Sequence, residues 1–142
     1  MKIPKYLTQT EWVQPTEYPD LRDYDEIAID LETRDPDLKS KGSGAVTGNG
    51  EVVGIAVATF NDKWYFPIAH GEGPNTNRAK TLEWFKDICG CPATKIFHNA
   101  MYDVCWIRNL GIKINGLIVD TMIACSVLDE NRFAYTLNDL SC

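Results

Sequence analysis

Hydrophobic and polar positions along this chain switch between a two-residue period and a period near 3.6, which are the repeats of strands and helices. In chain order the periods predict three strands, a helix, a strand, a helix, a short strand and a helix. The segments are residues 27–33, 52–60, 63–68, 74–89, 95–97 and 101–110, with the last helix starting after Asp120. This order is typical of an α/β fold with a mixed central sheet and helices on its faces.

The same pattern predicts where some segments end and which side they bury. Asn61 and Asp62 form a two-residue turn of the hairpin type between the second and third strands. The helix over 74–89 should end at Gly90 and bury one apolar face. That face comprises Ala79, Leu82, Phe85 and Cys89. The helix after Asp120 has no charged residue in its first two turns, so we expect it to be buried. Its inner face would include Met122, Ile123, Val127 and Leu128.

Two carboxylates, Asp30 and Glu32, stand two residues apart at the end of the first strand. Side chains alternate between the faces of a strand, so both carboxylates point to one face while Leu31 points to the other. Two like charges side by side repel each other, and a divalent cation with oxygen ligands relieves that repulsion. Mg²⁺ or Mn²⁺ bound in this way serves phosphate chemistry. The alternative is an exposed strand end that carries two solvated acids.

A second polar cluster follows the fourth strand, in the run His98-Asn99-Ala100-Met101-Tyr102-Asp103. Asn99 marks the change from strand to helix, and Asp103 falls in the first turn of the helix. The helix macrodipole favours an acid there, so one interpretation of Asp103 is a capping role. The other is that Asp103 completes a metal site with Asp30 and Glu32, and that Asn99 binds a phosphate or a metal-bound water.

A third segment begins at Asp120, which can cap the helix that follows it. It contains the runs Asp120-Thr121-Met122, Leu128-Asp129-Glu130-Asn131 and Tyr135-Thr136-Leu137-Asn138-Asp139-Leu140. With the two acidic clusters before it, this segment resembles the 3′-5′ proofreading exonuclease domain of family A (Pol I-like) DNA polymerases, above all those of phages. The resemblance extends from about Ile27 to Leu140. It implies a ribonuclease H-like fold and membership of the DEDD exonuclease superfamily.

The resemblance implies that three acids bind metal and act in catalysis. Asp30 resembles the carboxylate that bridges two metal ions. Glu32 resembles the one that binds the nucleophile-side ion and helps to orient the attacking water. Asp103 resembles the acid that holds the second ion, largely through water. The implied cofactors are two divalent cations, Mg²⁺ or Mn²⁺, and the implied reaction is phosphodiester hydrolysis that removes 3′-terminal nucleotides.

The resemblance also implies a substrate and the residues that bind it. Thr33 and Asn99 match positions that contact the terminal nucleotide, and Leu38 matches an apolar residue that wedges against the terminal base. The expected partners are the 3′ end of single-stranded DNA and a polymerase domain or a missing C-terminal segment. An exonuclease that acts on RNA is the alternative, because ribonuclease D-type enzymes share the D-x-E and N-x-x-x-D pattern.

The family pattern needs a fourth acid, in a Y-x-x-x-D motif on a helix well beyond the L-x-D-L segment. We expect no such motif between Asp120 and Cys142, so that the chain stops before it. Thr136 and Asp139 predict the start of a helix that only three residues follow, which points to the same truncation.

These expectations divide the chain into two parts. Residues 1–22, which contain three prolines, are expected to be an extended leader. Residues 23–142 are expected to be an incomplete 3′-5′ exonuclease domain. The alternative function is a non-catalytic fragment that lacks the fourth acid and binds nucleic acid or a partner chain. Such a fragment would expose apolar surface where its last helices belong.

Composition and charge limit the partners and the compartment. The net charge of −6 argues against a broad basic surface for duplex DNA, but not against an enzyme that grips only the last nucleotides of a strand. No apolar stretch is long enough to cross a bilayer, so we expect no membrane partner. Five cysteines and no signal peptide predict free thiols in a reducing cytosol. We therefore expect a cytoplasmic protein, in the host cytoplasm if a phage encodes it.

The segment between the first two strands, residues 34–50, contains four glycines and three basic residues. The basic residues are Arg34, Lys39 and Lys41. Loops are polar in any case, so these charges are either solvated or part of a flexible flap that contacts phosphate.

Overall fold

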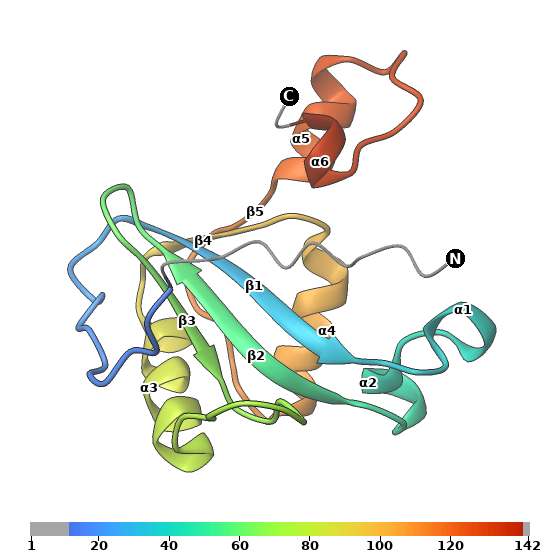
Figure 1. Ribbon diagram of the computed structural model, residues 1–142. Helices are drawn as coiled ribbons and strands as arrows, with labels where there is room; N and C mark the ends of the chain where they lie inside the picture. Colours follow the sequence, from blue (N-terminus) through green and yellow to red (C-terminus); the bar gives the residue numbers. More distant parts are fainter. Residues whose placement is uncertain (1–11, 141–142) are drawn as a thin grey trace.

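A five-stranded mixed sheet forms the centre of the molecule, in the strand order β3-β2-β1-β4-β5 (Figure 1). The computed structural model describes residues 12–140. The strands are β1 (Glu26–Arg34), β2 (Glu51–Ala58), β3 (Lys63–Pro67), β4 (Thr94–Phe97) and β5 (Ile118–Asp120). β1 lies at the centre, antiparallel to β2 on one side and parallel to β4 on the other. β3 pairs antiparallel with β2 at one edge, and β5 pairs parallel with β4 at the other edge. The predicted α/β fold with a mixed sheet is confirmed.

The core lies between one face of the sheet and two helices, α3 (Arg78–Gly90) and α4 (Ala100–Asn109). Alternation along β1 buries Ile27, Ile29 and Leu31 on this face, as expected for a half-buried strand. Phe85 of α3 and Trp106 of α4 are almost fully buried against them. Burying large apolar side chains of this kind supplies most of the free energy that favours folding. The core face therefore fixes the positions of β1 and α4, the two elements that carry the predicted acids.

The opposite face of the sheet and the last helices are more open. α5 (Thr121–Leu128) and α6 (Leu137–Leu140) stand clear of the sheet in Figure 1, and α5 contains no buried residue. Ile123, Val127 and Leu128 are 58%, 78% and 85% exposed. The prediction of a buried helix after Asp120 is therefore wrong, because the described residues leave most of the apolar side of α5 uncovered.

Two finer predictions from the pattern also differ from the structure. Four residues, not two, connect β2 and β3, and the Thr59 N–H donates to the carbonyl of Asp62 across this turn (2.8 Å). α3 begins at Arg78, because the Asn77 side chain accepts the Lys80 N–H (3.0 Å) as the N-cap. The buried face consists of Thr81, Phe85, Ile88 and Cys89. Phe85 and Cys89 are therefore buried as predicted, Leu82 is partly buried against the core, and Ala79 is exposed.

Residues 12–22 contain no helix or strand, yet they pack on the body of the domain. Leu21 is buried in the core, and the ring of Tyr18 stacks on Phe66 with 5.3 Å between centroids. The indole N–H of Trp84 donates to the carbonyl of Pro19 (2.7 Å). The rest of the predicted leader, residues 1–11, lies outside the described residues. Within residues 12–140, no helix is long and apolar enough to span a membrane.

The segment between β1 and β2 contains two short helices, α1 (Leu38–Lys41) and α2 (Gly44–Thr47). We call residues 35–50 the arm. The Asn109 side chain of α4 donates to the carbonyl of Ala45 (3.0 Å), which ties the arm to α4. This segment, interpreted either as a loop with solvated charges or as a flexible flap, thus has local structure and an anchor.

Lys95 is fully buried on the core face of β4. Its ammonium group donates to the carbonyl oxygens of Ala93 (2.9 Å) and Asn115 (3.0 Å) and to that of Cys91. A buried ammonium is costly unless acceptors surround it. These three carbonyls therefore stabilise Lys95, and Lys95 joins the segments that lead into β4 and β5.

Lys95→Met should lower the free energy of unfolding by on the order of 2–4 kcal/mol, because it leaves buried carbonyl oxygens without a donor. Urea denaturation followed by tryptophan fluorescence measures the change. Lys113→Met, at an exposed lysine, is the matched control and should lie within about 0.5 kcal/mol of the wild type. Equal stability of the two variants would show that the carbonyls do not depend on Lys95.

Candidate carboxylate site at the edge of the central strand

The Asp103 carboxylate is attached to the backbone of β1. β1 pairs with β4 only as far as Ala28, so beyond that point its N–H groups on this edge have no strand partner. Asp103 Oδ1 accepts the Leu31 N–H at 3.0 Å and supplies the missing acceptor. The side chain is only 4% exposed. This bond fixes the first turn of α4 against β1, one residue from Asp30.

Burial and charge both act on this carboxylate. Burial raises the pKa of Asp103 to about 7, the Leu31 N–H opposes that rise, and the nearby charge of Asp30 adds to it. Burial also raises the pKa of Asp30, while His98 lowers it. The two acids are therefore close enough for the charge of one to disfavour ionisation of the other. A cation between them would remove that penalty.

Glu32 lies on the same face of β1 as Asp30, but it does not form a three-acid cluster with Asp30 and Asp103. Within residues 12–140, no group of three or more His, Cys, Asp or Glu side chains is close enough to hold a metal ion. Glu32 is exposed at the end of the regular pairing, where the β1–β2 register shifts between Glu32 and Thr33. The structure thus brings Asp30 and Asp103 together and leaves Glu32 beside them. The three acids fit a divalent cation in their chemistry, since carboxylate oxygens are the ligands that such cations prefer.

A tyrosine on β3 lies close to both strand acids. Burial raises the pKa of Tyr65, and the charges of Glu32 and Asp30 raise it further. Its side chain lies over Gly54, the β2 partner of Glu32, where a Cβ atom would stand 2.0 Å from the phenol oxygen. The alternation of β3 indicates which face Tyr65 takes, but only the strand pairing reveals its proximity to the acids.

Asp120 caps two helices at once. Its carboxylate accepts the N–H groups of Asn99 (3.1 Å) and Ala100 (2.8 Å) at the start of α4, and that of Met122 (2.9 Å) at the start of α5. Burial opposes ionisation, but these N–H groups together hold the pKa of Asp120 below its usual range. The predicted cap of α5 is confirmed. The cap of α4 was assigned to Asp103 in one interpretation, whereas Asp120 provides it.

Because Asp120 caps α4, Asn99 does not have to. Asn99 is the one described residue other than glycine with a positive φ, at 65°, and its side chain makes no capping hydrogen bond. Asparagine tolerates this left-handed conformation better than most residues do. Its side chain is exposed at the start of α4, the helix that carries Asp103.

The other two predicted substrate residues lie at and beyond the end of β1. Thr33 is half-buried, and its hydroxyl bonds with the Tyr102 hydroxyl of α4 (2.8 Å). Leu38 is 42% exposed in α1, in the arm, and not on β1 or α4 where the acids lie (Figure 1).

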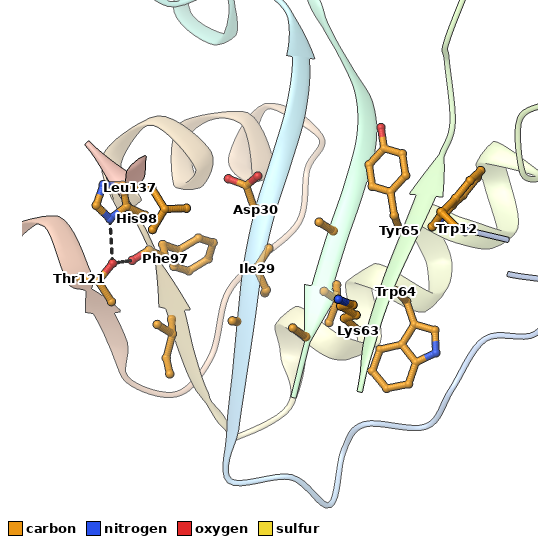
Figure 2. A pocket seen from close by; sticks show the side chains of 15 residues that line it. Trp12, Ile29, Asp30, Lys63, Trp64, Tyr65, Phe97, His98, Thr121 and Leu137 are labelled. Carbon is orange, nitrogen blue, oxygen red and sulfur yellow. Dashed lines mark hydrogen bonds between the residues drawn. The ribbon is translucent and has the colours of Figure 1, made fainter. Parts of the chain in front are cut away.

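A trough of about 480 Å³ crosses the open face of the sheet beside Asp30. Figure 2 shows Tyr65 and Trp12 on one side of it and His98 and Leu137 on the other. The small residues of its floor are Ala28, Ala56 and Ala58. His98 is held in place by hydrogen bonds to the Thr121 hydroxyl and the Tyr135 carbonyl, both 2.9 Å. Sequence reasoning did not identify this trough, because its floor consists of alanines that carry no chemical signal.

A Y-x-x-x-D spacing does occur after Asp120, at Tyr135 and Asp139, so the prediction that this part of the chain lacks one is wrong. The pair belongs to the L-x-D-L segment itself. Asp139 is exposed in α6, and its carboxylate accepts the Thr136 hydroxyl at the start of that helix. The Tyr135 hydroxyl donates to the carbonyl of Asp129 (2.5 Å). Both side chains therefore serve the local turn, and neither is assigned to the carboxylate site.

Comparison with known proteins identifies the family of this chain. A family model described as 3′-5′ exonuclease, of the DNA polymerase A type, matches residues 17–141. A DNA-directed DNA polymerase of Pseudomonas phage M6 is 28% identical over 146 residues, which cover 93% of this chain and 21% of that polymerase. DNA polymerase I of Chloroflexus aurantiacus is 30% identical over 84 residues, which cover 58% of this chain and 9% of that protein. The chain thus spans about a fifth or less of these two relatives.

A solved structure supports the fold. Brucella melitensis NrnC with bound Mg²⁺ superposes with a TM-score of 0.58 and 19% identity, over 85% of this chain and 53% of that one. The predicted ribonuclease H-like fold is confirmed.

Asp103→Asn should stabilise the protein at pH 8 by on the order of 2–4 kcal/mol and have little effect near pH 4. The folded-state pKa of Asp103, about 7, lies above the unfolded value of 3.8, so the wild type loses stability as pH rises through this window. Asparagine keeps an acceptor for the Leu31 N–H and carries no charge. Urea denaturation at several pH values measures the difference. A stability difference that does not change with pH would contradict the assigned burial of Asp103.

Proposed function

This chain belongs to the 3′-5′ exonuclease family of the DNA polymerase A type, and from that premise we propose that it removes nucleotides from the 3′ end of single-stranded DNA. The reaction is hydrolysis of the last phosphodiester bond, and its role is proofreading during DNA replication. One observation carries the proposal beyond the family match. The buried Asp103 carboxylate is bonded to the backbone of β1 beside Asp30, where the two acids share one edge of the sheet.

We propose that Asp30, Glu32 and Asp103 hold two divalent cations, Mg²⁺ or Mn²⁺. Exonucleases of this family use divalent metals, and the Brucella neighbour is a structure with bound Mg²⁺. When bound, such cations supply positive charge that activates the attacking water and stabilises the leaving 3′ oxygen. Asp103 and Asp30 are already adjacent, and Glu32, exposed on the same face as Asp30, is free to turn towards them. The repulsion between the acids favours cation binding, because the bound charge offsets it.

Three residues are proposed to bind the strand end. Asn99 presents an exposed amide at the start of α4, the helix that carries Asp103, since Asp120 caps that helix. Thr33 lies one residue beyond Glu32 on β1. Leu38, exposed in α1, would reach the terminal base from the arm.

The relatives suggest the setting in which this activity operates. Both curated relatives are DNA polymerases, so we propose that the exonuclease works beside a polymerase domain and shares its DNA. That role places the protein in the cytoplasm where the DNA is replicated, the host cytoplasm in the case of a phage.

The second candidate is a non-catalytic module that binds nucleic acid or a partner chain. It is favoured by the absence of a three-acid cluster within residues 12–140 and by the open trough on the sheet. The two candidates differ in whether the strand end is only held or also cleaved.

Asp30→Ala and Asp103→Ala should each reduce the release of mononucleotide from a 3′-labelled single strand in Mn²⁺ by at least about 100-fold. Loss of a residue that only supports a metal ligand already costs 10- to 100-fold, and these residues are proposed as the ligands themselves. Folding should remain intact, which circular dichroism checks. Glu83→Ala, at an exposed acid on α3, is the control and should keep the wild-type rate.

A wild-type rate in either aspartate variant would contradict the proposed roles. If the wild type and both variants all release no mononucleotide, the binding module would be favoured. Removal of the metal by EDTA should abolish release in the wild type, and release that persists in EDTA would exclude the cation mechanism.

A further inference from the structure

A line of three side chains runs from the end of β1 through α4 to the arm. The hydroxyls of Thr33 and Tyr102 are 2.8 Å apart. The Tyr102 hydroxyl donates to Asp35 Oδ2 at 3.0 Å. The backbone N–H of Gly44 donates to the same oxygen at 2.9 Å. The line therefore connects Thr33, the proposed contact to the terminal nucleotide, with the anchored part of the arm.

The direction of these hydrogen bonds follows from the number of protons available. A tyrosine hydroxyl has one proton, and Tyr102 gives its proton to Asp35. The bond between Tyr102 and Thr33 must then use the single proton of Thr33. The Thr33 oxygen is left with lone pairs only. It can accept a hydrogen bond from a ligand but cannot donate one.

Asp35 cannot easily turn away from this line. A Cβ atom on Gly44 would stand 2.2 Å from the carbonyl oxygen of Asn49 and 3.0 Å from Asp35 Oδ1, so the backbone of the arm packs tightly around the carboxylate. The bond from Asn109 to Ala45 holds the same part of the arm on α4. The acceptor at the end of the line is thus fixed by the fold.

We infer that Tyr102 and Asp35 are positioning residues that keep the Thr33 hydroxyl as an acceptor, so that the site prefers a strand ending in a 3′-hydroxyl over one ending in a 3′-phosphate. This inference rests on the proposed function, in which Thr33 contacts the terminal nucleotide. A free 3′-hydroxyl donates a proton to Thr33. A terminal phosphate offers mainly acceptor oxygens and brings negative charge, so it has no partner there.

The test is the binding of two fluorescein-labelled oligothymidylates, one with a 3′-hydroxyl and one with a 3′-phosphate, measured by fluorescence anisotropy in Ca²⁺. The wild-type chain should bind the hydroxyl form more tightly. Tyr102→Phe frees the proton of Thr33 for a phosphate oxygen. It should reduce the preference for the hydroxyl form by about 3- to 10-fold, the worth of one hydrogen bond.

A matched control and a double variant separate positioning from general damage. Tyr18→Phe removes another bond between a tyrosine and a threonine hydroxyl, 2.9 Å from Tyr18 to Thr81, and should leave the preference unchanged. Thr33→Val should lose the preference as well. Adding Tyr102→Phe to Thr33→Val should then change nothing further, because Tyr102 acts through Thr33.

The inference is overturned if the wild type shows no preference, or if Tyr102→Phe keeps the wild-type ratio of the two dissociation constants. Release of mononucleotide in Mg²⁺, measured separately, tests the proposed function. A wild type that releases nucleotide while Tyr102→Phe keeps the ratio would reject only the role of Tyr102. A wild type that prefers the hydroxyl end through Tyr102 but releases nothing would reject only the exonuclease activity.

Discussion

The hydrogen bond from the Leu31 N–H to the Asp103 carboxylate connects the two elements on which the candidate site is built. It exists because β1 continues beyond the end of its pairing with β4, which leaves a backbone donor at the edge of the sheet. A buried donor needs an acceptor, and the first turn of α4 supplies one. The acid placed there cannot move far from Asp30. The backbone requirement of β1 thus places two carboxylates side by side. Their charges repel each other without a cation, and a bound cation would offset that repulsion.

The remaining contacts keep this pair in place and leave its surroundings accessible. The Asp120 carboxylate, at the end of β5, accepts the N–H groups at the start of α4. Neither Asn99 nor Asp103 is therefore needed as a cap. Tyr102, on the turn that carries Asp103, extends the connection to Asp35 and the arm. Asp103, Asp120 and Tyr102 therefore each have a defined hydrogen-bond partner, and Asp30, Glu32 and Asn99 are exposed. A site that binds cations and a charged strand end needs both properties.

Much of the sheet and the local placement of the three acids could be predicted from the sequence, because both depend on local periodicity and short spacings. The period-two pattern of β1 places Asp30 and Glu32 on one face, and the position of Asp103 follows from the helix start. Contacts across the fold could not be predicted in this way. The second cap made by Asp120 depends on the pairing of β4 with β5. The exposure of α5 also escaped prediction, since an uncharged helix indicates burial only when another element covers it.

The most direct test of the account is the pKa of Asp103, measured by carbon-13 NMR of the labelled side-chain carboxyl with and without Mg²⁺. The Asp103→Asn variant assigns the signal. Without metal the pKa should be near 7, as burial beside Asp30 requires, and saturating Mg²⁺ should lower it well below that value because a cation favours the charged form. An ordinary pKa without metal, or one that Mg²⁺ leaves unchanged, would contradict the claim that these two carboxylates form a cation site.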